Sequence, residues 1–189
     1  KGKEVLFKKM EYVRFPLRLG HDVFNDGKIS KPTADKFIKL MKTYKLLIDL
    51  YEADDYLFCA TSAMRESENG KELAARVKKE VGVTIHIISG QAEADLINKA
   101  IFSYLSRQKT YLHIDVGGGS TEITIYHQNS VYASHSFNIG TLRLLLDKVS
   151  KNQWDEMKDW VKSKTQTIDS INAIGSGGNI NKLFKMYGK

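Results

Sequence analysis

The residue types best suited to chemistry are concentrated in residues 111–126, YLHIDVGGGSTEITIY. Asp115 ends one β-prone run, three glycines and two hydroxyls follow, and Glu122 lies at the start of the next run. Consecutive glycines let backbone N–H groups turn toward an anion without a Cβ in the way. Two carboxylates flanking such a turn can hold a Mg²⁺ that also contacts phosphate oxygens. A plain β-hairpin would explain the glycines but not the polar residues around them, so the pattern favours a phosphate site.

A second glycine turn, IGSGGN, occupies residues 174–179 between an expected strand and an expected helix. A helix N-terminus behind a glycine loop can bind an anion, although a tight strand–helix connection would use the same residues. Neither turn is a Walker A loop, because no Gly-Lys-Ser/Thr follows. Ile180 stands where the dinucleotide fingerprint needs its third glycine, so that fingerprint is absent too.

Two other polar segments each place a charged residue beside a predicted strand. Arg65 lies in ATSAMRESEN, residues 60–69, where it could clamp a phosphate or simply be a surface arginine. Glu93 lies in ISGQAEADL, residues 88–96, in the first turn of an expected helix, where the helix dipole already favours an acid. Next to a phosphate site, the same carboxylate could accept a proton from an attacking water.

Other kinds of active site find little support. The five histidines form no metal pattern, and His113 with Asp115 lacks a third nearby ligand for zinc. The sequence contains no Gly-x-Ser-x-Gly nucleophile elbow. Cys59 lies in an apolar run and is expected to be a buried structural thiol.

Composition is that of an ordinary globular protein. The chain has 189 residues, of which 42% are hydrophobic and 27% charged. It has no run near the roughly 20 apolar residues of a membrane span, and its first residues do not resemble a signal peptide. A single cysteine excludes an intrachain disulfide and favours the reducing cytoplasm. The net charge of +7 suits an anionic substrate or a solvated surface, and charge alone leaves both open.

Periodicity predicts an α/β protein with a mixed sheet. The expected strands are residues 4–14, 56–60, 84–88, 111–115, 122–126, 131–137 and 170–174. The expected helices are residues 30–52, 69–82, 92–105, 142–149, 153–164 and 179–186, with Asn69 and Glu72 as an Asn variant of a capping box. Residues 15–28 and 61–69 are expected to be loops, and residues 106–110 to be a domain boundary.

Taken together, these segments resemble the exopolyphosphatase/guanosine pentaphosphate phosphatase (Ppx/GppA) family. The resemblance rests on ATSAMRESEN, IISGQAEADLI, IDVGGGSTEI and IGSGGN in the family's order, with SFNIGTLRL (residues 136–144) as a linking segment. It implies an actin-like fold of two ribonuclease-H-like lobes with mixed sheets. On this chain the lobes would span residues 1–107 and 108–189, with the active site in the cleft between them.

The resemblance also implies roles for individual residues. Glu93 would be the general base that activates water, and Asp115 and Glu122 would hold Mg²⁺ or orient that water. Phosphate contacts would come from Arg65, Gly117, Gly118, Ser120, Gly177 and Gly178.

Two departures from the family pattern stand out. The Asp-x-Gly-Ser-Asn-type phosphate loop that opens the family is not found here, and Ala92 replaces the first of two glutamates that often precede the alanine. We therefore expect the sequence to be a fragment, incomplete at both ends, or to omit segments.

The expected function is metal-dependent release of terminal phosphate from inorganic polyphosphate or guanosine pentaphosphate. One alternative is a module that binds polyphosphate or a guanosine penta- or tetraphosphate without turnover, as the departures would allow. A second alternative is an actin-like ATPase or kinase, which the glycine turns allow but the Ser-Gly-x-x-Glu-Ala segment argues against. We expect no DNA, RNA or membrane partner, a cytoplasmic location, and a homodimer as a candidate assembly.

Overall fold

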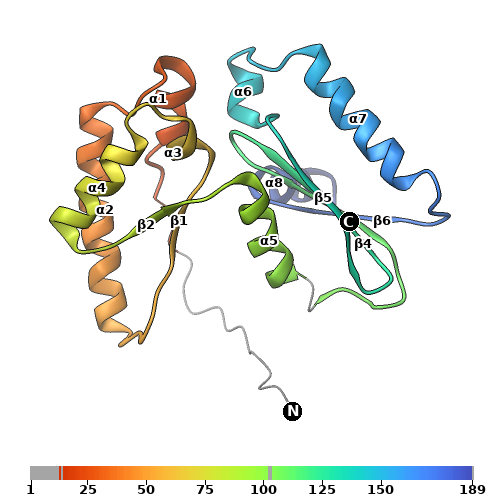
Figure 1. Ribbon diagram of the computed structural model, residues 1–189, viewed down its shortest axis with the longest axis horizontal. Helices are drawn as coiled ribbons and strands as arrows, with labels where there is room; N and C mark the ends of the chain where they lie inside the picture. The colour runs from red at the N-terminus through yellow and green to blue at the C-terminus, as the bar shows by residue number, and fades with distance from the viewer. Residues whose placement is uncertain (1–12, 14, 102–103, 189) are drawn as a thin grey trace.

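The computed structural model describes residues 13, 15–101 and 104–188. Apart from Val13, the strand expected over residues 4–14 lies outside them. The described elements form two units (Figure 1): α1–α4 with β1 and β2 make the N-terminal unit, and α5–α8 with β3–β6 make the C-terminal unit. Among the described helices, none has both the length and the apolar character needed to cross a membrane.

The N-terminal unit packs helices beside a short parallel strand pair, β1 (Phe58–Ala60) and β2 (Ile85–Ile87). Its helices are α1 (Leu19–Asp26), α2 (Lys31–Leu50), α3 (Ser62–Glu66) and α4 (Gly70–Val81). Helix α2 begins as predicted, with the Ser30 hydroxyl accepting the N–H of Thr33 and a proline in the first turn. The unit's buried apolar core consists of Val23, Phe24, Ile29, Ala34, Phe37, Ile38, Met41, Met64, Leu73, Val77 and Val83.

The C-terminal unit contains a four-stranded sheet in the order β5-β4-β3-β6. Strands β3 (Tyr111–Val116), β4 (Thr121–His127) and β5 (Ser130–Phe137) are antiparallel, and β6 (Asn172–Ser176) runs parallel to β3. This mixed sheet confirms the predicted fold class. The unit's helices are α5 (Gly90–Ile101), α6 (Thr141–Leu145), α7 (Lys151–Thr165) and α8 (Gly178–Tyr187).

The faces of the sheet explain why these helices pack where they do. The apolar face of α7, formed by Trp154, Met157, Trp160 and Val161, packs on a core of Ile123, Phe137 and Ile139. Helix α5 lies against β4 and β5, so it belongs to the C-terminal unit. The predicted division of the chain at residues 107 and 108 would assign that helix to the first lobe, and the division itself stays a prediction.

Three local predictions are wrong. Residues 15–28 contain α1, because Val23 and Phe24 bury one face of a helix despite Pro16 and Gly20 nearby. Residues 61–69 contain the short helix α3. Cys59 is exposed, because the short strand β1 turns that side chain away from the core.

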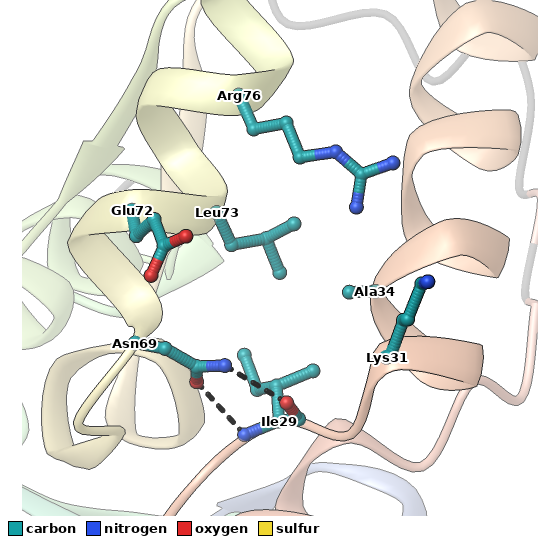
Figure 2. A pocket seen from close by; sticks show the side chains of 7 residues that line it. All are labelled: Ile29, Lys31, Ala34, Asn69, Glu72, Leu73 and Arg76. Atoms are coloured by element: carbon teal, nitrogen blue, oxygen red, sulfur yellow. Dashed lines mark hydrogen bonds between the residues drawn. The ribbon is translucent and has the colours of Figure 1, made fainter.

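The predicted capping box at the start of α4 does not form. The helix ends close to its predicted bound, and Gly82 follows it in the left-handed conformation. Asn69 makes no side-chain cap. Its amide instead pairs with the backbone of Ile29, accepting from the N–H and donating to the carbonyl at 2.9 Å each (Figure 2). A contact forty residues away thus replaces the local one and ties the start of α4 to the start of α2.

Candidate active site

The glycine turn joins β3 to β4 and places two carboxylates across from each other. Asp115 and Glu122 are direct partners in the antiparallel register, so their side chains lie on the same face of the sheet. Glu122 is only 4% exposed, and one of its oxygens accepts a 2.8 Å hydrogen bond from the hydroxyl of Ser136 on β5. A buried negative charge therefore lies just beyond the turn.

The carbonyl groups of the three glycines in the turn point toward α6. The carbonyl of Gly117 accepts from the N–H of Thr141 at 3.0 Å, and that of Gly118 accepts from the N–H of Leu142 at 2.8 Å. The carbonyl of Gly119 accepts from the Nε of Arg143 at 2.6 Å. Three consecutive peptide groups are thereby held in one orientation.

This orientation determines where the N–H groups point. In a trans peptide the C=O of one residue and the N–H of the next point in opposite directions. The N–H groups of Gly118, Gly119 and Ser120 therefore face away from α6, and no other residue in the described part of the chain accepts a hydrogen bond from them. Successive unpaired N–H groups of this kind form an anion cradle. The N–H of Gly117 bonds to the carbonyl of Ser120 at 2.9 Å, so Gly117 shapes the cradle without donating into it.

Glu93 lies in the first turn of α5, where its N–H bonds to the carbonyl of Ser89. Its side chain is 21% exposed, and its Oε2 atom lies 3.9 Å from Nη1 of Arg65. That oxygen is buried and, among the described residues, has no hydrogen-bond partner. Arg65 is itself held in place by donating from Nη1 to the carbonyl of Ile88 at 2.7 Å.

The environment of Glu93 strongly disfavours its charge. Burial raises the pKa of the Glu93 carboxyl from 4.5 to about 7, and the negative charge of Glu122 adds to the increase. The positive charge of Arg65 and a hydrogen bond from Thr61 oppose the increase but do not cancel it. A carboxylate whose pKa is near neutrality is suited to accept a proton at physiological pH.

Close packing brings Glu93 and Glu122 into the same neighbourhood. A Cβ added to Gly90, at the start of α5, would lie 2.5 Å from the hydroxyl oxygen of Ser136. The same hydroxyl binds Glu122, so the first turn of α5 sits directly over that carboxylate. Glycine at position 90 is what allows this approach.

The second glycine turn meets the first because β6 runs beside β3. Gly177 has a φ of 95° and a ψ of 167°, a conformation that is essentially restricted to glycine. A Cβ at Gly177 would lie 2.9 Å from Oδ1 of Asp115, whereas a Cβ at Gly178 would meet nothing within 4 Å. Gly177 therefore lies against the predicted metal-binding carboxylate, and Gly178 opens α8.

A buried histidine supports this junction. Nε2 of His113 lies 3.0 Å from the hydroxyl of Ser176, next to Gly177. Burial lowers the pKa of His113, which Asp115 only partly offsets. A neutral His113 thus fixes the end of β6 without adding charge to the site.

The predicted site residues gather around the glycine turn, where Asp115 and Glu122 face each other. Arg65 and Glu93 lie together beside Glu122, and Asp115 lies beside Gly177. The predicted set did not include several residues that shape the site, namely Thr61, Gly90, Gly119, Ser136 and Arg143. Each of them lies within a segment that carries the family resemblance, but its role depends on partners from another element.

The carboxylate oxygens at this site are the kind of ligand that a hard cation such as Mg²⁺ prefers. Among the described residues, no three acidic, histidine or cysteine side chains are grouped closely enough to hold a metal by themselves. Mg²⁺ does not need such a group, because it commonly binds through one or two carboxylates, several waters and substrate phosphates. Asp115 and Glu122, which face each other across β3 and β4, are two carboxylates of the required kind.

Comparison with known proteins gives this site its context. Residues 1–179 match the model of the Ppx/GppA phosphatase family. The chain belongs to this family. The bifunctional 3-dehydroquinate synthase/phosphatase of Fusobacterium nucleatum is 29% identical over 91% of this chain and 27% of its own length. Exopolyphosphatase 1 of Mycobacterium bovis is 27% identical over 82% of this chain and 47% of its own length. The chain thus spans less than half of either relative.

Solved structures of the Ppx/GppA family have the same fold. A crystal structure of an exopolyphosphatase from Cytophaga hutchinsonii has a TM-score of 0.75 and 26% identity, covering 86% of this chain and 56% of that one. The Aquifex aeolicus Ppx/GppA family member has a TM-score of 0.67 over 92% of this chain and 60% of that one, at 24% identity. The predicted family and fold class are confirmed.

The conformation of Gly177 predicts a position-specific cost. Gly177→Ala should lower the free energy of unfolding by about 2 kcal/mol, because the added Cβ is strained and crowds Asp115. Gly178→Ala is the matched control and should be neutral or slightly stabilising, since its Cβ meets open space at a helix start. Urea denaturation of both variants checks this, and equal stability of the two would contradict it.

The pKa of Glu93 predicts a pH-dependent gain from removing its charge. Between pH 4.5 and 7 the folded state binds more protons than the unfolded state, so this residue's contribution to stability falls as the pH rises. Glu93→Gln should therefore stabilise the protein by about 1–3 kcal/mol at pH 8 and give no such gain at pH 4. Denaturant titrations at both pH values measure this, with the exposed Glu156→Gln as control. A gain of the same size at both pH values would count against a buried charge.

Proposed function

We propose that this protein hydrolyses the terminal phosphoanhydride bond of inorganic polyphosphate or guanosine pentaphosphate, using Glu93 as a general base. The observation that carries the proposal is the Glu93 carboxylate itself. It has a pKa of about 7, a buried oxygen with no partner in the described chain, and a cation beside it. Membership of the Ppx/GppA phosphatase family supports the reaction class.

The proposed step is an attack of water on the terminal phosphorus. Glu93 takes one proton from the water as the new P–O bond forms, and the anhydride bond breaks to release phosphate and the shortened product. Such reactions depend mainly on positioning and on stabilising the charge of the phosphoryl oxygens. The N–H groups of Gly118, Gly119 and Ser120 would bind those oxygens, and Arg65 would add a positive charge.

Asp115 and Glu122 are the residues that would hold Mg²⁺. When bound, the metal would neutralise negative charge on the phosphate oxygens. The hydroxyl of Ser136 would keep Glu122 oriented. The packing of Gly177 against Asp115 would keep that carboxylate in place.

The two candidate substrates are suggested by the names of similar proteins. Exopolyphosphatase 1 of Mycobacterium bovis is named for one of them. A guanosine-5′-triphosphate,3′-diphosphate pyrophosphatase of Pseudoalteromonas translucida is 34% identical over the matched segment. That segment covers 46% of this chain and 17% of the relative. Their shared chemistry is a terminal phosphate on a phosphoanhydride, which is what the cradle and Glu93 would recognise.

The proposal predicts both a lost activity and a pH profile. With full-length protein and Mg²⁺, Glu93→Gln should lower phosphate release roughly 10²–10⁴-fold, because it removes the general base.

In the wild type, kcat/KM should fall about tenfold per pH unit below about pH 7, where Glu93 becomes protonated. Release should be assayed separately from long-chain polyphosphate and from guanosine pentaphosphate, with Glu156→Gln as the control.

Three outcomes would be informative. Undiminished release by Glu93→Gln would remove Glu93 from the proposed role. Binding of either substrate by the wild type without release would instead support a non-catalytic binding module. Release from one substrate alone would identify the subclass.

A further inference from the structure

Arg143 on α6 joins the glycine turn of the C-terminal unit to two helices of the N-terminal unit. Its Nε donates to the carbonyl of Gly119 at 2.6 Å, and its Nη2 pairs with the carboxylate of Glu66, the last residue of α3. Its Cζ lies 4.6 Å from the ring centroid of Phe24 on α1. The Arg143 side chain is only 13% exposed, whereas that of Glu66 is 32% exposed, so the ion pair lies at the solvent-accessible edge of this contact.

Other contacts at this boundary hold α6 against the N-terminal unit. The partly buried side chains of Leu142 and Leu146 pack against that unit's apolar core. The ammonium of Lys148 donates to the carbonyl of Phe24, in the last turn of α1. A Cβ on Gly119 would lie 2.5 Å from the hydroxyl of Ser62, so the turn itself touches the start of α3.

The ion pair of Arg143 has a direct geometric consequence for the phosphate site. Glu66 follows Arg65 in the same short helix, and Arg65 is the proposed phosphate-binding cation. Arg143 thus holds the carbonyl of Gly119, and with it the N–H of Ser120 in the same peptide group, at a fixed position relative to Arg65. Lysine could carry the same charge but not form two bonds in a fixed fork.

We propose that Arg143 is a positioning residue of the phosphate site, which sets the spacing between Arg65 on α3 and the N–H cradle of the glycine turn. The inference rests on the proposed function for the identity of the bound group, a chain of phosphates. Beyond the proposed function, it names the residue that fixes the geometry of the phosphate site. Arg143 does not touch the substrate in this arrangement and acts through Gly119 and Glu66.

The test is a double-mutant cycle with a matched control pair. In full-length protein, Arg143→Lys, Glu66→Gln and their combination are compared with Arg76→Lys, Asp35→Asn and their combination. Arg76 and Asp35 form a 2.8 Å ion pair between α4 and α2, and within the described part of the chain neither side chain bonds to the glycine turn. The readouts are kcat/KM with polyphosphate and the Kd for inorganic tripolyphosphate, the latter measured in a Glu93→Gln background so that turnover does not interfere.

We expect Arg143→Lys to weaken tripolyphosphate binding and to lower kcat/KM, each roughly 10- to 100-fold, the range for losing a charge-assisted hydrogen bond. Glu66→Gln should have a smaller effect, and the double variant should be no worse than Arg143→Lys alone. The Arg76 and Asp35 variants should change neither readout more than about twofold, within the range of a surface ion pair.

The outcomes separate this inference from the proposed function. Wild-type affinity and kcat/KM in Arg143→Lys would overturn the positioning role, even if the melting temperature fell. Equal losses in the Arg76→Lys control would overturn it too. A wild type that binds tripolyphosphate with an Arg143-dependent Kd but releases no phosphate would uphold the inference and reject the hydrolase.

Discussion

The site depends on holding a carboxylate where its charge is disfavoured. Glu93 is half-buried and lies near the buried Glu122, and the positive charge of Arg65 compensates its negative charge only in part. Such an arrangement destabilises the folded state at neutral pH and persists only because other contacts outweigh it. The packing of α5 on β4 and β5, with Gly90 directly over Ser136, is the contact that brings these groups together.

The glycine turn also depends on a partner that is distant in the sequence. Its glycines permit the turn, but residues 141–143 decide which way the peptide groups point. Once three carbonyls are bound on one side, three N–H groups must face the other. The cradle is therefore a product of two segments, and Arg143 extends its support across to α3 and α1. On this view, phosphate recognition depends on how the two units pack as well as on the glycine turn.

Sequence reasoning succeeded where a pattern is local and periodic. The bounds of α2, α4, β3, β4 and β5 were each predicted to within two residues. It failed where a distant partner decides the outcome. Asn69 bonds to Ile29 instead of capping α4, and α1 forms because its apolar face is buried by other helices. The charged residues of the proposed site were singled out from their motifs, and their roles stay predictions. The raised pKa of Glu93 and the proposed role of Arg143 depend on tertiary contacts that no local spacing encodes.

The most direct measurement is a carbon-13 NMR titration of the Glu93 side-chain carboxyl in the full-length protein, assigned by comparison with Glu93→Gln. The account predicts a midpoint near pH 7 that moves down in Glu122→Gln, because burial and the charge of Glu122 both raise this pKa. A midpoint near 4.5 that does not respond to Glu122 would contradict it, because Glu93 would then have no more affinity for a proton than an ordinary glutamate.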